Sequence, residues 1–462
     1  MHRLFAALLL VCACATAENH GVVAIRNAKI VTVGGPVLAK GTVVIRNGLI
    51  EAVGENVQAP ADAAVIEGDG LTVYPGLVDG LSTWGMPGGA ATAAGGGRGA
   101  TAAAPAAAPT GAAATATPSR GPEDRPQTTS WLKAADEIQP GDRRIVTARA
   151  AGFTTAVAFP TRGIFAGQGA IFDLLTGETT GEMVVAPGAG QYIALATGGR
   201  GGGGGGGFPS SLMGTIAYIR QVYLDAAHYT LVKDAYARDP RGMERPAYDR
   251  ALEGVLESKR ILLPANRLVE IDRMLRFAAE LKQPVILYGM QEGFRPEAVE
   301  LLKKAGVPAL VSLKWPEAPR DPDPELVESL RTLQTRDQAA SAPMMLKKAG
   351  VPFAFYSDGV DVARDLQRAV KKAIDAGLSR DDAVRALTLS PAEIYGVADR
   401  LGSIEKGKIG NLVVTRGDIF DDRTKVEMVF VDGVKYIPPP EAPAGGRGAP
   451  ATAEAPAQGG VR

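Results

Sequence analysis

Two aspartates in apolar surroundings are the residues of this chain best suited to acid–base chemistry. Asp79 lies in PGLVDGLSTWG at residues 75–85, and Asp358 lies in FYSDG at residues 355–359. A carboxylate can serve as a general base, and two carboxylates can hold a hard cation weakly with water and backbone oxygens. Each also has a structural interpretation: Asp79 as an acceptor for loop backbone, and Asp358 as a turn residue at a strand end.

Histidines, the usual partners of carboxylates in metal sites, are scarce in this chain. They are His2 and His20 near the amino terminus and His228 in YLDAAHYTLVKDAY, a polar-rich helical stretch. Zinc hydrolases hold their metal with imidazole and carboxylate ligands, and a lone helical histidine is more typical of a surface position. The sequence therefore predicts no histidine-built metal site and no metal cofactor.

The first 17 residues, MHRLFAALLLVCACATA, have the organisation of an export signal. Arg3 supplies the positive start, residues 4–11 the apolar stretch, and residues 15–17 a small-residue cleavage site. Residues 11–14 also loosely resemble a lipoprotein box, so two alternatives stay open: a free periplasmic or extracellular protein, or one lipid-anchored at Cys14. Both cysteines lie in this segment, so the mature chain is expected to lack disulfides and cysteine nucleophiles.

The composition is that of a soluble globular protein. The chain has 462 residues, of which 46% are hydrophobic and 22% charged, and its 50 basic residues balance its 50 acidic residues. This balance gives no indication of nucleic acid or an anionic membrane surface as a partner. The length suffices for two domains, or for one large barrel with an appendage.

Three stretches of low complexity interrupt the chain. They are residues 86–126 and 198–207, which we expect to be flexible insertions, and the tail 438–462. Such Ala-, Gly- and Pro-rich segments cannot bury enough apolar surface to offset their ordering entropy. A second Gly-rich piece, residues 162–169, lacks the spacing of a phosphate-binding loop and is expected to be a barrel loop.

Between these stretches, β-like and helix-like segments alternate, which is typical of βα units and a parallel sheet. Predicted helices cover residues 144–151, 268–281, 295–305, 342–349, 364–376 and 380–387, and predicted strands cover 154–159, 284–288, 309–313 and 352–356. The first segment, residues 22–54, is β-rich, and Asn47-Gly48 within it predicts a hairpin. The chain becomes β-rich again after Arg400, so we expect both ends to pair into one small sandwich.

Five ordered segments resemble the amidohydrolase superfamily, and in particular its imidazolonepropionase-like branch. They are IRNAKIVTVGG with GTVVIRNGLIEAVG, PGLVD, the stretch from AADEIQPGD to AIFDLLTG, ALTLSPAEIYGVADRLGSIEKGKIGNLVVTRGD, and VFVDGVKY. The resemblance implies a (β/α)₈ TIM-like barrel over residues 75–400. It further implies a composite β-sandwich built from residues 18–74 and 401–437. By family, the activity would be metal-dependent hydrolysis of non-peptide carbon–nitrogen bonds.

The family's metal ligands are missing when its pattern is placed on this sequence. Leu81 and Thr83 stand where the first strand usually carries two histidines, and Pro264 and Tyr288 stand at the histidine positions of two middle strands. Asp358 matches the aspartate of the last strand, which the resemblance makes the general base and the one catalytic candidate. Asp79, Leu81, Thr83, Pro264 and Tyr288 are candidates for lining the pocket.

Two functional hypotheses follow, and they predict different sites. A degenerate hydrolase predicts carboxylates that converge with Asp358 at an open barrel mouth. A non-catalytic pseudoenzyme predicts that Leu81 and Pro264 fill the metal volume and that Asp358 is capped. Such a protein would bind a small molecule, form a homo-oligomer or pair with an intact relative, and a binding subunit predicts an exposed apolar patch.

Overall fold

The structure is a computed structural model that describes residues 21–87, 125–176, 179–195, 208–209, 211–319, 321, 327–421 and 424–439. The expected export signal, residues 198–207 and most of the stretches 86–126 and 438–462 lie outside the described residues. Among the described residues, no helix combines the length and the apolar composition that a membrane span requires.

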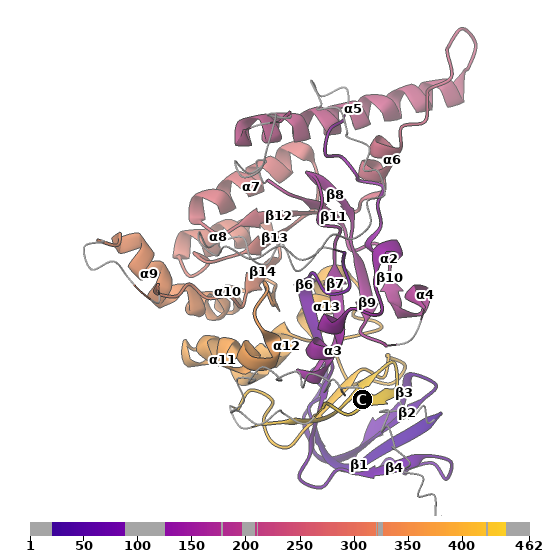
Figure 1. Cartoon of the computed structure of the whole chain (residues 1–462), viewed down its shortest axis with the longest axis vertical. Helices are drawn as coiled ribbons and strands as arrows, with labels where there is room; N and C mark the ends of the chain where they lie inside the picture. Colours follow the sequence, from indigo (N-terminus) through magenta and orange to yellow (C-terminus); the bar gives the residue numbers. More distant parts are fainter. Residues whose placement is uncertain are drawn as a thin grey trace, which may run out of the picture.

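Both ends of the chain contribute to one eight-stranded sheet, at the lower end of Figure 1. Its strands are β1 (Val22–Ile30), β2 (Leu38–Arg46), β3 (Leu49–Gly54), β4 (Ala64–Glu67), β5 (Thr72–Pro75), β16 (Leu412–Thr415), β17 (Val426–Val431) and β18 (Val434–Tyr436). The two ends join where β5 pairs antiparallel with β16. The predicted hairpin is confirmed, because Asn47 and Gly48 connect β2 to β3 with φ of 49° and 79°, as a tight hairpin turn requires.

Two further sheets form the centre of the molecule, in the orders β10-β9-β7-β6 and β15-β14-β13-β12-β11-β8. Their strands are β6 (Leu77–Ser82), β7 (Phe153–Ala158), β8 (Phe165–Gln168), β9 (Ala170–Asp173), β10 (Val184–Ala186), β11 (Gln191–Ile193), β12 (Ile261–Ala265), β13 (Val285–Gly289), β14 (Ala309–Ser312) and β15 (Phe353–Tyr356). Strands β11 to β15 run parallel, as the βα alternation predicts. Strands β8 and β9 pair antiparallel with their neighbours β11 and β7, which the alternation does not predict.

The two central sheets are adjacent at β6 and β15, are connected through β8 and β9, and share one interior. At one end, only Gly169 separates β8 from β9. At the other end, the backbone of Ser357, just after β15, donates a hydrogen bond to Asp79 in β6. Apolar side chains from both sheets pack in a single cluster, to which β7 contributes Val157 and β12 contributes Leu262. The two sheets therefore pack on one shared apolar core.

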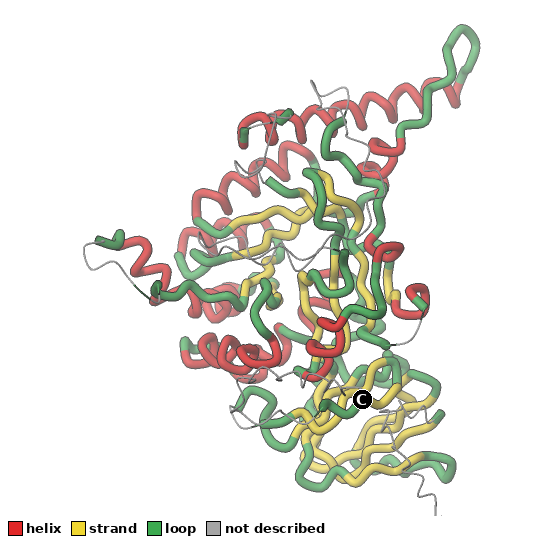
Figure 2. Tube along the Cα trace, viewed as in Figure 1, coloured by secondary structure: helices red, strands yellow, loops and turns green. Residues whose placement is uncertain are grey.

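Helices lie outside both central sheets (Figure 2). They are α2 (Ala134–Glu137), α3 (Arg143–Ala150), α4 (Thr180–Met183), α5 (Leu212–Arg238), α6 (Arg250–Glu257), α7 (Leu268–Leu281), α8 (Pro296–Ala305), α9 (Leu330–Gln338), α10 (Ala342–Ala349), α11 (Val362–Asp375), α12 (Arg380–Ala386) and α13 (Leu389–Tyr395). Of these, α2, α3 and α4 contact β9, β7 and β10 of the four-stranded sheet, respectively. The six predicted helices are confirmed, with ends within two residues of those observed. The 27-residue helix α5 lies along the edge farthest from the composite sheet (Figure 1).

Two expectations about Gly-rich segments need correction. The piece 162–169 is not only a loop, because Phe165–Gln168 form the buried strand β8. The insertion expected over 86–126 is too wide at both ends. Met86 is buried in the core, and Arg125 bridges the carboxylates of Asp225 and Asp249. Met86 and Arg125 are therefore part of the folded body.

A buried carboxyl group connects the central sheets to the composite sheet. Asp173, at the end of β9, accepts hydrogen bonds from the Thr155 hydroxyl at 2.7 Å and from the Asn411 side-chain amide at 2.8 Å. The Asn411 oxygen in turn accepts from the backbone N–H of Asp432 at 2.7 Å. Burial raises the pKa of Asp173 to about 7, although both hydrogen bonds favour its ionised form.

Candidate functional site at the carboxyl ends of the strands

Asp79 lies in β6 and is fully buried, with both carboxylate oxygens engaged. One oxygen accepts from the backbone N–H of Ser357 at 2.9 Å and from that of Leu81 at 3.4 Å, and the other accepts from the Ser357 hydroxyl at 2.5 Å. Burial raises the pKa of Asp79 to about 7, against the effect of these hydrogen bonds. Asp79 thus links β6 to the end of β15, and both of its carboxylate oxygens are bound by protein groups.

Asp358 follows β15 in a left-handed conformation with φ of 49°, which non-glycine residues rarely adopt. Its carboxylate accepts a hydrogen bond from the Ser312 hydroxyl at 2.7 Å. The residue as a whole is exposed, but its carboxyl group lies against protein, and burial raises the pKa of that group. Ser312 and the charge of Lys314 partly oppose the shift. Tyr356 opposes the shift as well, so the Asp358 carboxyl group is capped by neighbouring hydroxyl groups at the rim of the interior.

Three tyrosines occupy the space beside Asp358, at the carboxyl ends of the strands. The Tyr192 and Tyr288 hydroxyls, from β11 and β13, are hydrogen-bonded at 2.8 Å, and their rings stack with centroids 5.7 Å apart. Tyr356 of β15 meets Tyr288 edge-on at 6.2 Å. Leu81, Tyr192 and Tyr288 pack against the same buried apolar cluster, to which Tyr356 belongs. These residues, Leu81, Tyr192, Tyr288, Tyr356 and Asp358, are called the mouth cluster below.

The electrostatics of the mouth cluster keep the tyrosines protonated at neutral pH. Burial raises the pKa of Tyr192, Tyr288 and Tyr356, and the nearby charge of Asp358 raises each of them further. A neutral phenol donates and accepts hydrogen bonds but is a weak nucleophile and a weak base. The cluster can therefore orient a polar ligand better than it can activate water.

The two remaining predicted residues, Pro264 and Thr83, differ in how they relate to the mouth cluster. Pro264 in β12 is partly buried and lies opposite Tyr288 in the strand register. Thr83 is directed elsewhere, because its hydroxyl accepts a hydrogen bond from Arg144 of α3 at 3.3 Å. Asp79, Leu81, Tyr288 and Asp358 are thus brought to one end of the interior, and Thr83 contributes to holding α3.

The residues present do not fit an imidazole-held metal. Within the described part of the chain, no group of three or more His, Cys, Asp or Glu side chains is placed to hold a metal ion. Asp79 is saturated by Ser357 and Leu81, and His228 is exposed on α5. A structural or catalytic zinc site needs three or four converging protein ligands, and the described residues do not supply them.

Sequence reasoning missed Tyr192, Tyr356, Ser312 and Ser357. The available signal was the two-residue period of the strands, since Leu262, Ile286 and Leu310 share the interior cluster with Tyr356, and inward-facing positions recur at every second residue. Tyr192 follows a Gly-rich stretch in a strand of three residues, which is too short to show a period.

A separate hollow lies at the amino ends of β14 and β15. It has a volume of about 530 Å³ and is lined by Pro308, Pro352 and charged side chains. Those charges are already paired, Lys347 with Asp382 and Arg385 with Glu393. The hollow is therefore at the opposite strand ends from the mouth cluster and includes none of the predicted site residues.

Comparison with known proteins finds a family match over part of the chain. Residues 271–435 match the family model described as the Amidohydrolase family. These residues are an amidohydrolase family domain. It contains Tyr288, Asp358 and strand β16, whereas Asp79, Leu81 and Pro264 precede its first residue. No curated protein matches the chain.

Solved structures extend the likeness over most of the chain. An amidohydrolase from Thermotoga maritima MSB8 is 25% identical, with a TM-score of 0.70 over 90% of this chain and 100% of that one. A second amidohydrolase is 14% identical, with a TM-score of 0.52 over 91% and 100%. Molinate hydrolase is 17% identical, with a TM-score of 0.50 over 90% and 95%. These neighbours imply a TIM-barrel-type fold with a composite domain, and the amidohydrolase domain supports a hydrolase.

Proposed function

We propose that this chain is a non-catalytic member of the amidohydrolase fold, descended from its imidazolonepropionase-like branch, which acts by binding. The observation that carries the proposal is the mouth cluster. Where a metal hydrolase needs converging imidazoles and carboxylates, this chain has three tyrosines in mutual contact, Tyr192, Tyr288 and Tyr356, and Leu81 packs on the same apolar cluster. A small polar molecule that hydrogen-bonds to Tyr288 and Asp358 is the ligand this arrangement suits.

The alternative, hydrolysis without a tightly held metal, has less support. Such a reaction needs a base with a free lone pair next to water. Both carboxylate oxygens of Asp79 accept hydrogen bonds from Ser357 or Leu81. One carboxylate oxygen of Asp358 accepts a hydrogen bond from Ser312. The carboxyl group of Asp358 is thus already engaged by a hydroxyl group.

The proposed setting is outside the cytoplasm, as the export signal at residues 1–17 predicts. The chain would be periplasmic or extracellular, free or lipid-anchored at Cys14. In that setting the partners would be a small molecule, a second copy or an intact relative, and no nucleic acid.

Elemental analysis of the purified chain, before and after incubation with zinc or manganese, tests the proposal. We expect less than about 0.1 ion per chain in both samples, because two separately engaged carboxylates are a poor ligand set. Asp358→Ala should leave that value unchanged. Stoichiometric metal that is lost in Asp358→Ala would overturn the proposal and show a histidine-free metal site.

A kinetic assay with cyclic amides and dipeptides, run with and without chelator, separates the remaining alternative. We expect no turnover above the uncatalysed rate. Turnover that survives the chelator and disappears in Asp358→Ala, but persists in Thr83→Val, would establish metal-free hydrolysis with Asp358 as base. Thr83 is the matched control because its hydroxyl is directed to Arg144.

A further inference from the structure

Helix α5 is apolar on two opposite faces. Its inner face buries Thr215, Tyr218, Ile219, Val222 and Ala226. On the outer face, Met213, Leu224 and Leu231 are 83%, 65% and 67% exposed, and Ala217 and Ala227 between them are exposed as well. At 3.6 residues per turn, these five positions form one stripe opposite the buried face. A surface helix normally carries polar residues there.

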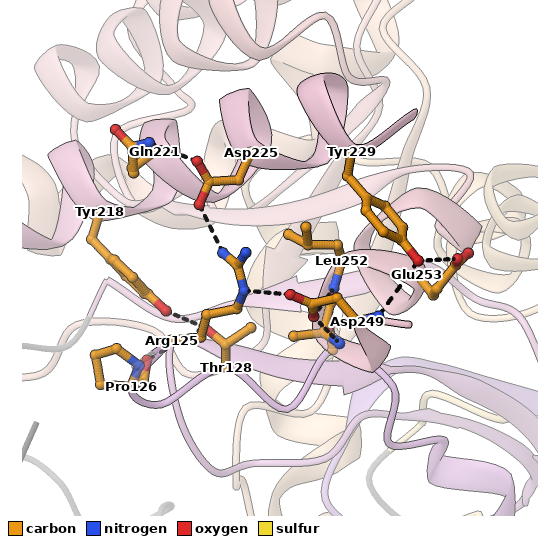
Figure 3. A network of polar contacts seen from close by, with 12 residues as sticks. Arg125, Pro126, Thr128, Tyr218, Gln221, Asp225, Tyr229, Asp249, Leu252 and Glu253 are labelled. Carbon is orange, nitrogen blue, oxygen red and sulfur yellow. Dashed lines mark hydrogen bonds and ion pairs between the residues drawn. The ribbon is translucent and has the colours of Figure 1, made fainter. Parts of the chain in front are cut away.

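The inner face fixes α5 rigidly to the body (Figure 3). Arg125 bridges Asp225 of α5 and Asp249 at the start of α6, at 2.8 Å to each. Tyr218 is hydrogen-bonded to Thr128, and Tyr229 donates to Glu253 at 2.9 Å. The outer stripe therefore lies on a helix that several polar contacts hold against the body.

The stripe has the spacing of a coiled-coil seam. Its residues 213, 217, 224, 227 and 231 occupy alternating three- and four-residue steps, with Arg220 completing the series. Eighteen residues of helix span about 27 Å. A partner that buries this stripe must therefore present a second apolar helix of similar length.

We propose that the occupant is α5 of a second copy of this chain, packed antiparallel across a two-fold axis near Ala227 and His228. About this axis, Leu224 of each copy lies against Leu231 of the other. The same rotation brings Arg220 at one end close to Asp234 at the other. A parallel pair would instead set Arg220 against Arg220 and Asp234 against Asp234, so charge complementarity selects the antiparallel pair.

The ends of the helix extend the same interface. The exposed Met213 of one copy points toward the segment after Arg238 of the other, which carries Met243, 38% exposed. The pairing leaves the ion pair between Arg220 and Glu280 intact, because Glu280 belongs to α7 of the same chain. This inference is independent of the proposed loss of catalysis, since α5 lies outside the mouth cluster.

The molecular mass in solution tests the pairing. Sedimentation equilibrium on the full chain should give a dimer, and Leu224→Glu with Leu231→Glu should raise its dissociation constant at least about 100-fold, because two charges would be buried unpaired. Leu330→Glu on α9 is the matched control, since Leu330 is 71% exposed and should leave the dimer unchanged. A monomeric wild type, or a dimer that the double variant does not weaken, would overturn the inference.

Disulfide trapping tests the orientation. In a background of Cys12→Ser and Cys14→Ser, chains with Leu224→Cys should cross-link to chains with Leu231→Cys when the two are mixed. Neither should cross-link alone, because each residue lies about 10 Å along the axis from its own equivalent. Cross-linking of Leu224→Cys with itself would overturn the antiparallel pairing in this register.

Discussion

The free energy of unfolding should fall as the pH rises from about 4 to about 7, because two buried carboxyl groups prefer to be protonated in the folded chain. Asp79 and Asp173 have an ordinary pKa of 3.8, and burial raises each to about 7 in the fold. Between these values the unfolded chain releases protons that the folded chain keeps. Their contribution to stability is thus complete below about pH 4 and is lost as the pH passes about 7.

The size of this effect follows from the shift itself. A change of about three pKa units corresponds to roughly 4 kcal/mol for each group. Asp79→Asn and Asp173→Asn replace the carboxyl group by a neutral amide of the same shape. The amide oxygen can still accept from Ser357 in the first case, and from Thr155 and Asn411 in the second.

Urea unfolding at pH 4, 5, 6 and 7 measures the slope. In each Asn variant, the slope of the unfolding free energy with pH should correspond to about one proton fewer than in the wild type. The stability of the variant relative to the wild type should therefore increase as the pH rises. Asp239→Asn is the control, because Asp239 is exposed and pairs with Arg241. Parallel stability curves for wild type and both buried variants would show that these carboxyl groups are ionised in the fold.

Gly254→Ala should destabilise the protein by about 2–4 kcal/mol, although alanine normally favours a helix over glycine. Gly254 lies in α6, and a Cβ there would fall 2.5 Å from the backbone carbon of Ser130 and 2.5 Å from the backbone nitrogen of Trp131. The clash is with main chain, which cannot rotate away. It would also strain the hydrogen bond from the Gln168 side chain to the Gly254 carbonyl, 2.7 Å long.

Thermal or urea unfolding provides the measurement, and Gly181→Ala provides the matched control. Gly181 also lies in a helix, α4, and a Cβ there meets nothing within 4 Å. That variant should be neutral or stabilising by about 0.5–1 kcal/mol. A loss below about 1 kcal/mol in Gly254→Ala would mean that the segment at Ser130 yields to the added methyl group.

The helices and parallel strands were predictable because their signals are local. The segment 268–281 repeats its apolar residues at helical spacing, and α7 occupies those same residues. Turn chemistry was equally informative at Asn47-Gly48. The joining of the two chain ends was expected because the chain becomes β-rich again after Arg400, but the specific pairing of β5 with β16 leaves no local pattern.

The mouth cluster was harder to predict, and the reason is physical. Leu81, Tyr288 and Asp358 could be placed by resemblance, but the partners that decide their behaviour come from other strands. Ser357 saturates Asp79 across the junction of β15 and β6. Tyr192 approaches Tyr288 from β11. Such contacts depend on how far each strand is shifted relative to its neighbour, and a single sequence does not encode that shift in a readable form.

The joining of both chain ends in one sheet has a consequence for biosynthesis. Asp79 and Ser357 are 278 residues apart in the chain. Thr72 of β5 likewise pairs with the distant Thr415 of β16. During synthesis the amino-terminal strands emerge first, so β5 has an open edge until the last strands leave the ribosome. The composite sheet and the contact between β6 and the end of β15 are therefore completed only after most of the chain has been made. In the exported setting proposed above, this late completion would leave the chain unfolded while it passes a translocation channel.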